Sequence, residues 1–404
     1  MSHDVLDRLR NLLGAAAVSR DPDGVPRAVP DSTDAVAATL RLAEASAWRV
    51  RLEGHGSWVP ADAPADLALT TRGLDRLVTV QPADLVATVE AGVSMDVLQR
   101  RLAAEGMWLA IDFPGRPERT VGSVVATATG GALRAGFGPV RDHILGCTAV
   151  TGDGRVVRPG GTVVKNVAGY DLTKLQVGGF GAFGVLTTLH LRLRALPTAD
   201  VTLVARAPRD HLTSAARDLA DAGVQPQALE LLSPAVAADS DWILAARCLG
   251  SEGGVAGDIA RILDVADLAW SRLDADGAHA FWHLVTHAGS GAGMTIRLGV
   301  LAPGLDELLD LVGQHLDEGL IWAGASQGGM RWAGDATADA LRTLRRLAAE
   351  REVPLTLERA PWPLRQVVGH FGAYREGVGP LVAQLREIFD PGGRLVVAMD
   401  EADA

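Results

Sequence analysis

Glycine is concentrated in one stretch of this chain, and this constrains its fold more than any other feature. Of the 46 glycines, 16 lie between Gly115 and Gly184, about twice their share by length. Because glycine costs backbone entropy, such a run indicates tight turns or backbone brought close to a ligand. Apolar residues alternate between the glycines, as in TAVTGDGRVVRPGG, which predicts strands with a hairpin turn at Asp153-Gly154 and excludes a low-complexity segment.

The chain as a whole is predicted to be α+β. A helix capped by Asp31 or Ser32 runs to about Ala47, and strands, helices and glycine turns then follow in repeated order. The strand over 185–196 alternates strictly and stops at Pro197, where we place a domain boundary. We expect a first domain over 1–197 with its core over about 26–197, a second over 198–375, and a C-terminal helix and tail over 376–404.

The second domain alternates strands with helices. This order favours an antiparallel sheet with helices on one face. The expected strands include 201–205, 242–246 and 295–300, and the expected helices are 210–222, 252–264, 304–317 and 336–351.

Composition and charge exclude several classes of function. A net charge of −11 over 404 residues, with no basic patch, argues against a nucleic-acid partner. No apolar run reaches the ~18 residues of a membrane span, and Asp4 and Asp7 interrupt what would be the basic region of a targeting signal. Cys147 and Cys248 lie in apolar surroundings without a CxxC or an iron–sulfur ligand set, which indicates buried free thiols in a reducing compartment. We therefore expect a cytoplasmic protein.

Two glycine-rich loops are the candidate binding elements. Gly54-His55-Gly56-Ser57 directly follows a strand, and small residues there expose consecutive N–H groups that can cradle a diphosphate. Such turns are common, but residues 114–131 add small and hydroxyl-bearing side chains that can meet a phosphate or a flat ring. The literal fingerprint Gly179-x-Gly181-x-x-Gly184 is not a dinucleotide-binding turn, because a strand follows it where a helix is required. The residues alone therefore indicate a ligand-binding protein without a self-evident catalytic group.

Three histidines follow a helical spacing in the second domain. His279, His283 and His287 would share one helix face, but no nearby carboxylate completes a zinc ligand set. With Trp282 beside them they form a candidate docking surface, because aromatic residues are enriched at interface cores. The alternative is a helix that packs on the sheet and leaves its histidines in water.

Six features follow one another over residues 26–197: Pro30 before the first helix, GHGS, ERTVGSVVATATGG, RDHILGCTAVTGDGRVVRPGG, VKNVAGYDLTKL and GGFGAFGVLT. In this order they resemble the FAD-binding domain of the vanillyl-alcohol oxidase/p-cresol methylhydroxylase (PCMH) superfamily. VKNVAGYDLTKL, with VRDHILG upstream, is most similar to the FAD-binding E subunit of bacterial glycolate oxidases, which Trp282 and the terminal FDPGG also fit.

The resemblance implies two subdomains that cradle FAD, followed by a cap domain with an antiparallel sheet. Members with covalent flavin often have His just before the last Ser of the first loop. Gly56 stands at that place here and His55 one residue earlier, so we expect non-covalent FAD. The residues that the resemblance assigns to FAD are Gly54, His55, Gly56, Ser57, Thr120, Gly122, Ser123, Thr129, Gly130, Gly169, Tyr170, Asp171 and Val185.

The resemblance also implies an oxidoreductase whose flavin accepts a hydride equivalent from a small 2-hydroxy acid and passes electrons to an iron–sulfur subunit, with a second flavoprotein subunit in the complex. The GDGNxH-type metal motif of that second subunit is absent, and no metal site is expected. Two alternatives stay open: a stand-alone FAD oxidoreductase on another hydroxy acid, alcohol or sugar, and a non-catalytic FAD-binding assembly subunit. A carboxylate substrate needs a cationic fork, for which Arg297 and Arg359 are candidates; a surface ion pair is the alternative for each.

Overall fold

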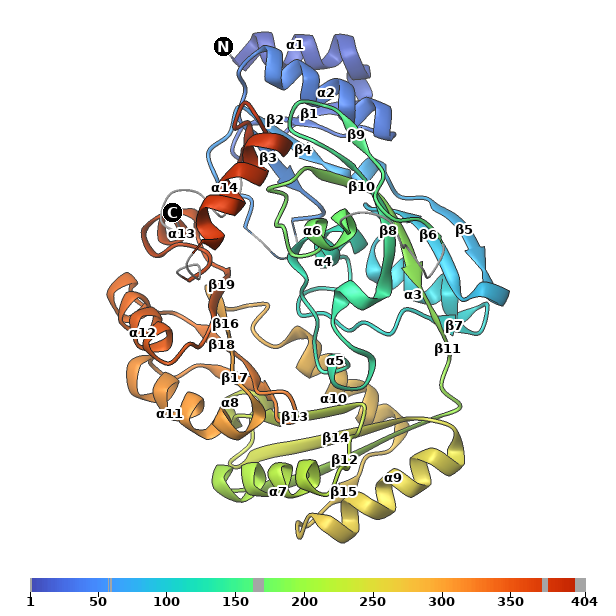
Figure 1. Cartoon of the computed structure of the whole chain (residues 1–404), viewed down its shortest axis with the longest axis vertical. Coiled ribbons are helices and arrows are strands. Elements are labelled where there is room, and N and C mark those ends of the chain that lie inside the picture. Colours follow the sequence, from blue (N-terminus) through green and yellow to red (C-terminus); the bar gives the residue numbers. More distant parts are fainter. Residues whose placement is uncertain (1, 57, 59, 163–170, 373–376, 397–404) are drawn as a thin grey trace.

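The computed structural model describes residues 2–56, 58, 60–162, 171–372 and 377–396, and it has two halves (Figure 1). The N-terminal half, blue to green in Figure 1, carries two five-stranded sheets, and the second half, yellow to orange, is built on one eight-stranded sheet. The last helices, drawn in red, run back beside the first half. This confirms the α+β class. In the described ranges, no helix is both long and apolar enough to cross a membrane.

The first sheet packs against two N-terminal helices. Ser32 begins the second of these helices by accepting the N–H of Ala35 at 3.2 Å, as its capping role predicts. Apolar side chains of both helices and of the sheet form one core, and neighbouring strands are parallel except for β1 and β2. The strand order is β1 (Val18–Arg20), β2 (Pro26–Ala28), β4 (Leu67–Thr70), β3 (Val50–Glu53) and β20 (Leu395–Val396), and the helices are α1 (Ser2–Leu13) and α2 (Thr33–Ala45).

The second sheet contains most of the glycine-rich stretch and is antiparallel. Gly154, with φ of +80°, lies in the turn between β8 and β9, as predicted. β10 begins directly after Gly184, so the GxGxxG segment leads into a strand, which confirms that it is not a dinucleotide-binding turn. The order is β5 (Leu77–Gln81), β6 (Val86–Glu90), β10 (Val185–Arg192), β8 (Ile144–Val150) and β9 (Val156–Val157); beside it lie α3 (Met95–Ala103), α4 (Val121–Thr127), α5 (Arg134–Phe137), α6 (Leu172–Gln176) and the pair β7 (Met107–Trp108) and β11 (Arg194–Ala195).

The cap sheet is antiparallel, as expected, and the four helices predicted from the sequence share one face. The expectation of helices on one face alone is corrected, because a smaller layer of helices covers the other face. One large core joins the sheet to α7 (Arg209–Asp221), α9 (Glu252–Val265), α11 (Leu305–His315) and α12 (Ala338–Glu350). A smaller core on the opposite face holds α8 (Pro234–Ala237), α10 (Ala275–His287) and Ala132 of the N-terminal half, so this face meets that half. The strand order is β15 (Ser271–Arg272), β12 (Ala199–Ala207), β14 (Trp242–Gly250), β13 (Ala228–Leu232), β17 (Leu320–Gly324), β18 (Gly329–Gly334), β16 (Met294–Gly299) and β19 (Leu355–Arg359).

The C-terminal segment returns to the N-terminal half. After the cap come α13 (Trp362–Val368) and α14 (Val378–Phe389), and β20 then pairs in parallel with β3. Asp390 closes the FDPGG turn by accepting the N–H groups of Arg394 and Leu395, both at 2.9 Å. The end of the described chain is therefore part of the first sheet, and residues from both ends of the sequence can line one site.

Candidate functional site

Two loops that are far apart in the sequence meet at a cleft in the N-terminal half. One is residues 54–56, directly after β3, and the other is residues 120–127, which form the start and body of α4. We call this the glycine-loop cleft; it encloses about 1080 Å³, including space open to solvent. The predicted FAD residues that line it are Gly54, His55, Gly56, Thr120, Gly122, Ser123 and Val185.

The loop over 54–56 is held by its carbonyl groups. Thr70 Oγ1 donates to the carbonyl of Gly54 at 2.9 Å, and Arg72 Nη2 donates to that of His55 at 3.0 Å. Among the described residues, nothing accepts from the amides of His55 and Gly56, so both can donate to phosphate oxygens. Gly56 has φ of +67°, and a Cβ added there would meet no protein atom within 4 Å. The loop therefore fits a diphosphate.

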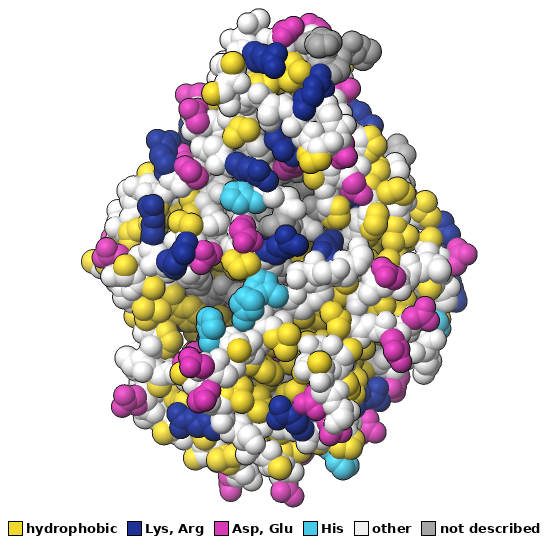
Figure 2. Space-filling model, turned by 180° about the vertical axis from the view of Figure 1, so that it is seen from behind, with side chains coloured by type: hydrophobic (Ala, Val, Ile, Leu, Met, Phe, Trp, Pro, Cys, Tyr) yellow, Lys and Arg dark blue, Asp and Glu magenta, His cyan; other side chains and the backbone are white. Residues whose placement is uncertain are grey.

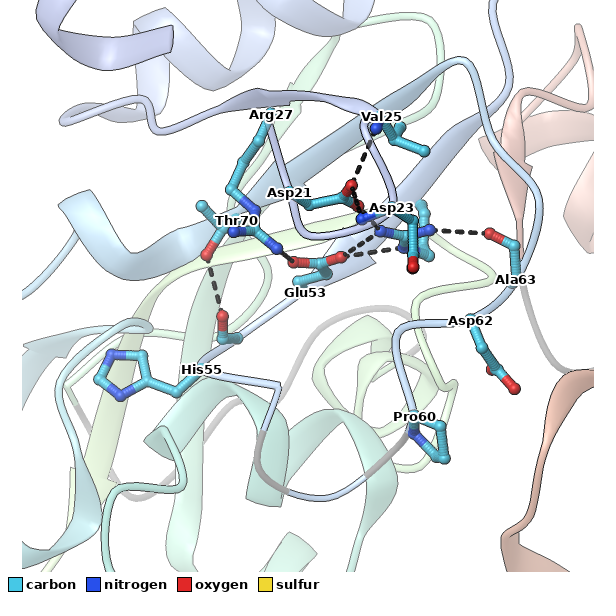
Figure 3. A network of polar contacts seen from close by, with 12 residues as sticks. Asp21, Asp23, Val25, Arg27, Glu53, His55, Pro60, Asp62, Ala63 and Thr70 are labelled. Carbon is cyan, nitrogen blue, oxygen red and sulfur yellow. Dashed lines mark hydrogen bonds and ion pairs between the residues drawn. The ribbon is translucent and has the colours of Figure 1, made fainter. Parts of the chain in front are cut away.

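A buried ionic network holds the base of this loop (Figure 3). Arg51 pairs with Asp21 and with Glu53, and it donates to the carbonyl of Ala63 at 2.9 Å. Arg27 adds a second cation to Glu53, with Nη2 at 3.2 Å from Oε2. In Figure 3 the imidazole of His55 points away from this network. Burial, with the charge of Arg72 next, lowers the pKa of His55, so its ring is neutral at pH 7.

The second loop is fixed by close packing. Thr120 Oγ1 accepts the N–H of Ser123 at 3.1 Å and thereby begins α4. Gly122 donates its N–H to the carbonyl of Ala91 at 2.8 Å, and a Cβ added at Gly122 would lie 2.8 Å from the Cβ of Ala91. At Gly54, a Cβ would lie 2.7 Å from Thr120 Oγ1. Glycine is therefore required where the loops approach each other and the sheet.

Arg119 ties the second loop together, a role that the sequence did not indicate. Its side chain is fully buried, with Nη1 donating to the carbonyl of Pro114 at 2.6 Å and Nη2 to the hydroxyls of Thr127 at 2.5 Å and Thr129 at 3.0 Å. Burial is the main cause that lowers the pKa of Arg119 to about 9. At neutral pH this side chain places a buried positive charge directly behind the loop.

The remaining predicted FAD residues lie elsewhere. Thr129 is buried and accepts a hydrogen bond from Arg119. The carbonyl of Gly130 accepts from Arg331 Nη2 at 2.9 Å, and neither residue lines the glycine-loop cleft. Asp171 begins α6, where it accepts the N–H of Thr173 at 3.1 Å, and it does not line the cleft. Ser57, Gly169 and Tyr170 fall outside the described residues.

The C-terminal segment supplies cleft residues that sequence reasoning missed. Trp362 and Arg365 of α13 line the cleft. Asp62, in the chain that follows the first loop, accepts the N–H of Trp362 at 2.5 Å and pairs with Arg365 at 2.5 Å. No local pattern points to these residues, because α13 reaches the cleft only through the return of the chain after the cap.

A second cavity lies between the two halves. It encloses about 600 Å³, including open space, and we call it the interdomain cavity. Its charged lining residues are Asp112, Arg134, Glu230, Arg297 and Arg331, and Gly130 and Gly131 of the N-terminal half also reach it. The segment that follows α4 therefore connects the two cavities.

The two candidate substrate arginines have different surroundings. Arg297 lines the interdomain cavity with its side chain 30% exposed, and its only ion pair among the described residues is with Glu358, at 3.4 Å. Arg359 lines neither cavity; it donates to the carbonyls of Gly289, Ser290 and Ala292. Both terminal nitrogens of Arg359 are occupied by backbone carbonyls, and its Nε is buried without a partner outside both cavities, so Arg297 is the better placed of the two.

His279, His283 and His287 lie on α10. Figure 2, which views the molecule from behind, shows histidine side chains grouped near the middle of the visible surface. The rings of His283 and His287 are 4.1 Å apart between centroids. Within the described chain, no group of three or more His, Cys, Asp or Glu side chains is arranged to hold a metal ion. Trp282 is buried, with Nε1 donating to Thr202 Oγ1 at 2.8 Å. Its expected place on an exposed docking surface is therefore wrong; docking by the histidines stays a prediction.

Comparisons with known proteins agree with this geometry. Residues 27–160 match the family described as "FAD binding domain". The chain is 30% identical over 330 residues to glycolate oxidase subunit GlcE of Escherichia coli, covering 78% of this chain and 82% of that protein. It is 29% identical to glycolate oxidase subunit GlcD of Bacillus subtilis and to D-2-hydroxyglutarate dehydrogenase of Xanthomonas citri, but spans only 45% and 40% of their lengths.

Solved structures show the same fold at low sequence identity. The 4-ethylphenol oxidase of Gulosibacter chungangensis matches with a TM-score of 0.77 and 15% identity, over 98% of this chain and 96% of that chain. An alkyldihydroxyacetonephosphate synthase matches with a TM-score of 0.70 and 15% identity, over 98% of this chain and 79% of that chain.

Proposed function

Because this chain belongs to the family of FAD-binding PCMH-type oxidoreductases that includes glycolate oxidase subunit GlcE, we propose that it is the FAD-containing subunit of a dehydrogenase of small 2-hydroxy acids. Membership makes it a FAD-dependent oxidoreductase related to hydroxy-acid enzymes. We further propose that electrons leave for an iron–sulfur subunit and that a second flavoprotein subunit completes the complex. A cytoplasmic location stays a prediction.

The chain's own residues would hold FAD without a covalent bond. The amides of His55 and Gly56 would donate to the diphosphate, and Thr120 and Ser123 line the opposite wall of the glycine-loop cleft. Arg119 links the two ends of the segment by donating hydrogen bonds to Pro114 and Thr129, and it adds a positive charge behind that segment. When bound, FAD supplies the acceptor for a hydride equivalent, and the protein supplies position and electrostatics.

The observation that carries the proposal is the position of Arg297. It lies in a cavity whose wall includes Gly130, on the same segment that lines the glycine-loop cleft. An arginine with free donors matches the planar carboxylate of a hydroxy acid. A substrate held there lies against the segment that also holds the cofactor.

The first test concerns the cofactor. We expect a purified chain with a flavin absorption spectrum, and precipitation with acid should release the yellow colour into the supernatant. Colour that stays with the pellet would overturn non-covalent binding and point to a bond at His55.

The second test separates the subunit from its alternatives. Co-expression with the neighbouring genes and affinity purification should recover a complex in which glycolate reduces the flavin under anaerobic conditions. Arg297→Ala should abolish this reduction, whereas Arg206→Ala, a control at an exposed ion pair with Asp239, should not change it. Full turnover by the chain alone would favour a stand-alone oxidoreductase, and a complex unaffected by Arg297→Ala would favour an assembly subunit.

A further inference from the structure

The interdomain cavity contains a buried carboxyl group without a counterion. Glu230 lies at the centre of β13, between Ala245 of β14 and Gly324 of β17, and is only 5% exposed. Among the described residues, no group donates a hydrogen bond to its carboxyl or forms an ion pair with it. Its carboxyl oxygens are not fully enclosed by protein atoms, since the residue lines the cavity. An unpaired carboxylate in such a place is costly, so the group favours its neutral form.

The other acidic groups of this region are satisfied. Glu358 pairs with Arg331, with Nε to Oε2 at 2.8 Å and Nη2 to Oε1 at 3.2 Å, and also with Arg297. Asp112 Oδ1 accepts the N–H groups of Gly131 at 3.2 Å and Leu133 at 3.1 Å. Among these three carboxyl groups, Glu230 is therefore the one without a hydrogen-bond or ion-pair partner in the described chain.

Burial, reinforced by the charge of Asp112, raises the pKa of Glu230 to about 8, against a smaller opposing effect of Arg331. Burial also raises the pKa of Asp112, although its backbone donors and the charge of Arg247 oppose this. Two coupled carboxyls titrate as a pair, and the pair retains a proton at pH 7. The group on which that proton resides is Glu230, because Asp112 has donors that stabilise its anion.

The charges of the cavity then favour one kind of ligand. Its lining has three cations, Arg134, Arg297 and Arg331, and Glu358, bonded to two of them, adds one anion to that of Asp112. With Glu230 neutral, three positive charges minus two negative charges leave one positive charge. If Glu230 ionises, the sum is zero and the attraction for an anion is lost. Arg331 is held by Glu358 and Gly130, whereas Arg297 keeps free donors.

We propose that the interdomain cavity selects small monocarboxylates. Arg297 binds the carboxylate of the ligand, and the protonated carboxyl of Glu230 donates a hydrogen bond to that carboxylate or to the ligand oxygen on the adjacent carbon. This inference rests on the proposed function, since it assigns the substrate class of the same site. A second negative charge on the ligand exceeds the single net positive charge of the cavity, which the first negative charge has already balanced. Ligand binding should also weaken as Glu230 loses its proton.

Two probes of nearly the same shape test the charge rule. Oxamate is a monoanion and oxalate is a dianion, and isothermal titration calorimetry on the FAD-loaded protein measures the Kd of each. At pH 7 oxamate should bind at least about tenfold more tightly than oxalate. Between pH 7 and pH 9, one unit above the pKa of about 8, the affinity for oxamate should fall about tenfold.

Variants assign the effect to Glu230. Glu230→Gln keeps the shape and a hydrogen-bond donor but cannot ionise, so oxamate should bind as in the wild type at pH 7 and equally well at pH 9. Burial alone still raises the pKa of Glu230 in Asp112→Asn, but the added effect of the Asp112 charge is lost, so the loss of affinity should begin at lower pH. Glu307→Gln, an exposed control on α11, should behave as the wild type. Melting temperature and flavin content establish that each variant is folded.

The results separate this inference from the proposed function. Oxalate binding as tightly as oxamate, or a Glu230→Gln variant with the pH dependence of the wild type, overturns the inference, even if hydroxy acids reduce the flavin. If oxamate binds as described and no hydroxy acid reduces the flavin of the complex, the inference holds and the proposed function fails.

Discussion

Replacement of Gly56 by alanine tests whether the cofactor runs along the first loop. Gly56 has φ of +67°, and its added Cβ would meet no protein atom within 4 Å. The methyl group would therefore enter the open space of the glycine-loop cleft. Gly223, at the end of α7, provides a matched control, because its φ is +66° and its Cβ also meets nothing within 4 Å.

Both variants carry the cost of backbone strain, but only Gly56→Ala also carries the cost of a contact with the cofactor. An L-residue in the left-handed region costs roughly 1–2 kcal/mol, so both should lower the free energy of unfolding of the FAD-free protein by that amount. In Gly56→Ala the methyl group also meets the bound cofactor. Overpacking costs roughly 1–3 kcal/mol, which corresponds to an increase in the Kd of FAD of about 5- to 150-fold.

Urea denaturation of the FAD-free protein and fluorescence titration with FAD measure the two quantities separately. We expect equal losses of stability and a weaker affinity for FAD in Gly56→Ala alone. Wild-type affinity in Gly56→Ala would refute the assignment of this loop to the cofactor. Weaker affinity in both variants would show that backbone strain, and not contact with FAD, controls binding.

Three further predictions concern packing and charge. Gly122→Ala should lower the free energy of unfolding by roughly 1–3 kcal/mol in urea, because its Cβ would lie 2.8 Å from the carbonyl oxygen of Ala91; an unchanged value would contradict the packing. Burial raises the pKa of both Cys147 and Cys248 to about 12, so neither thiol should react with a chromogenic disulfide at pH 8 until urea unfolds the chain. Burial opposes ionisation of Glu358, but its arginine partners outweigh burial and lower its pKa. The ionised side chain therefore stabilises the folded protein above about pH 4.5, and this contribution is lost as the pH falls through the lowered pKa. Glu358→Gln should cost roughly 3–5 kcal/mol at pH 7 and flatten the loss of stability in acid; a wild-type acid profile would show that the pair does not contribute.

Local structure followed closely from the sequence. The strand after Gly184 was predicted because apolar and polar residues alternate with period two, and this alternation alone excluded a dinucleotide-binding helix. The turn at Asp153-Gly154 and the cap at Ser32 were predicted in the same way, from residues within one turn of each other. Arg297 was a candidate because the chemistry of a carboxylate ligand favours an arginine, and it lies in a cavity.

What the sequence by itself determined about this protein is therefore its main helices and strands, its two glycine-rich loops and the family they resemble, because turn chemistry and periodicity act between near neighbours. Tertiary structure alone decided that Trp362 of α13 lines the same cleft as Gly56, and that Trp282 is buried. It also decided that Glu230, one acidic residue in an apolar strand, lies in a cavity without a counterion. Burial and charge compensation depend on which distant elements meet, and no local pattern of residues carries that information.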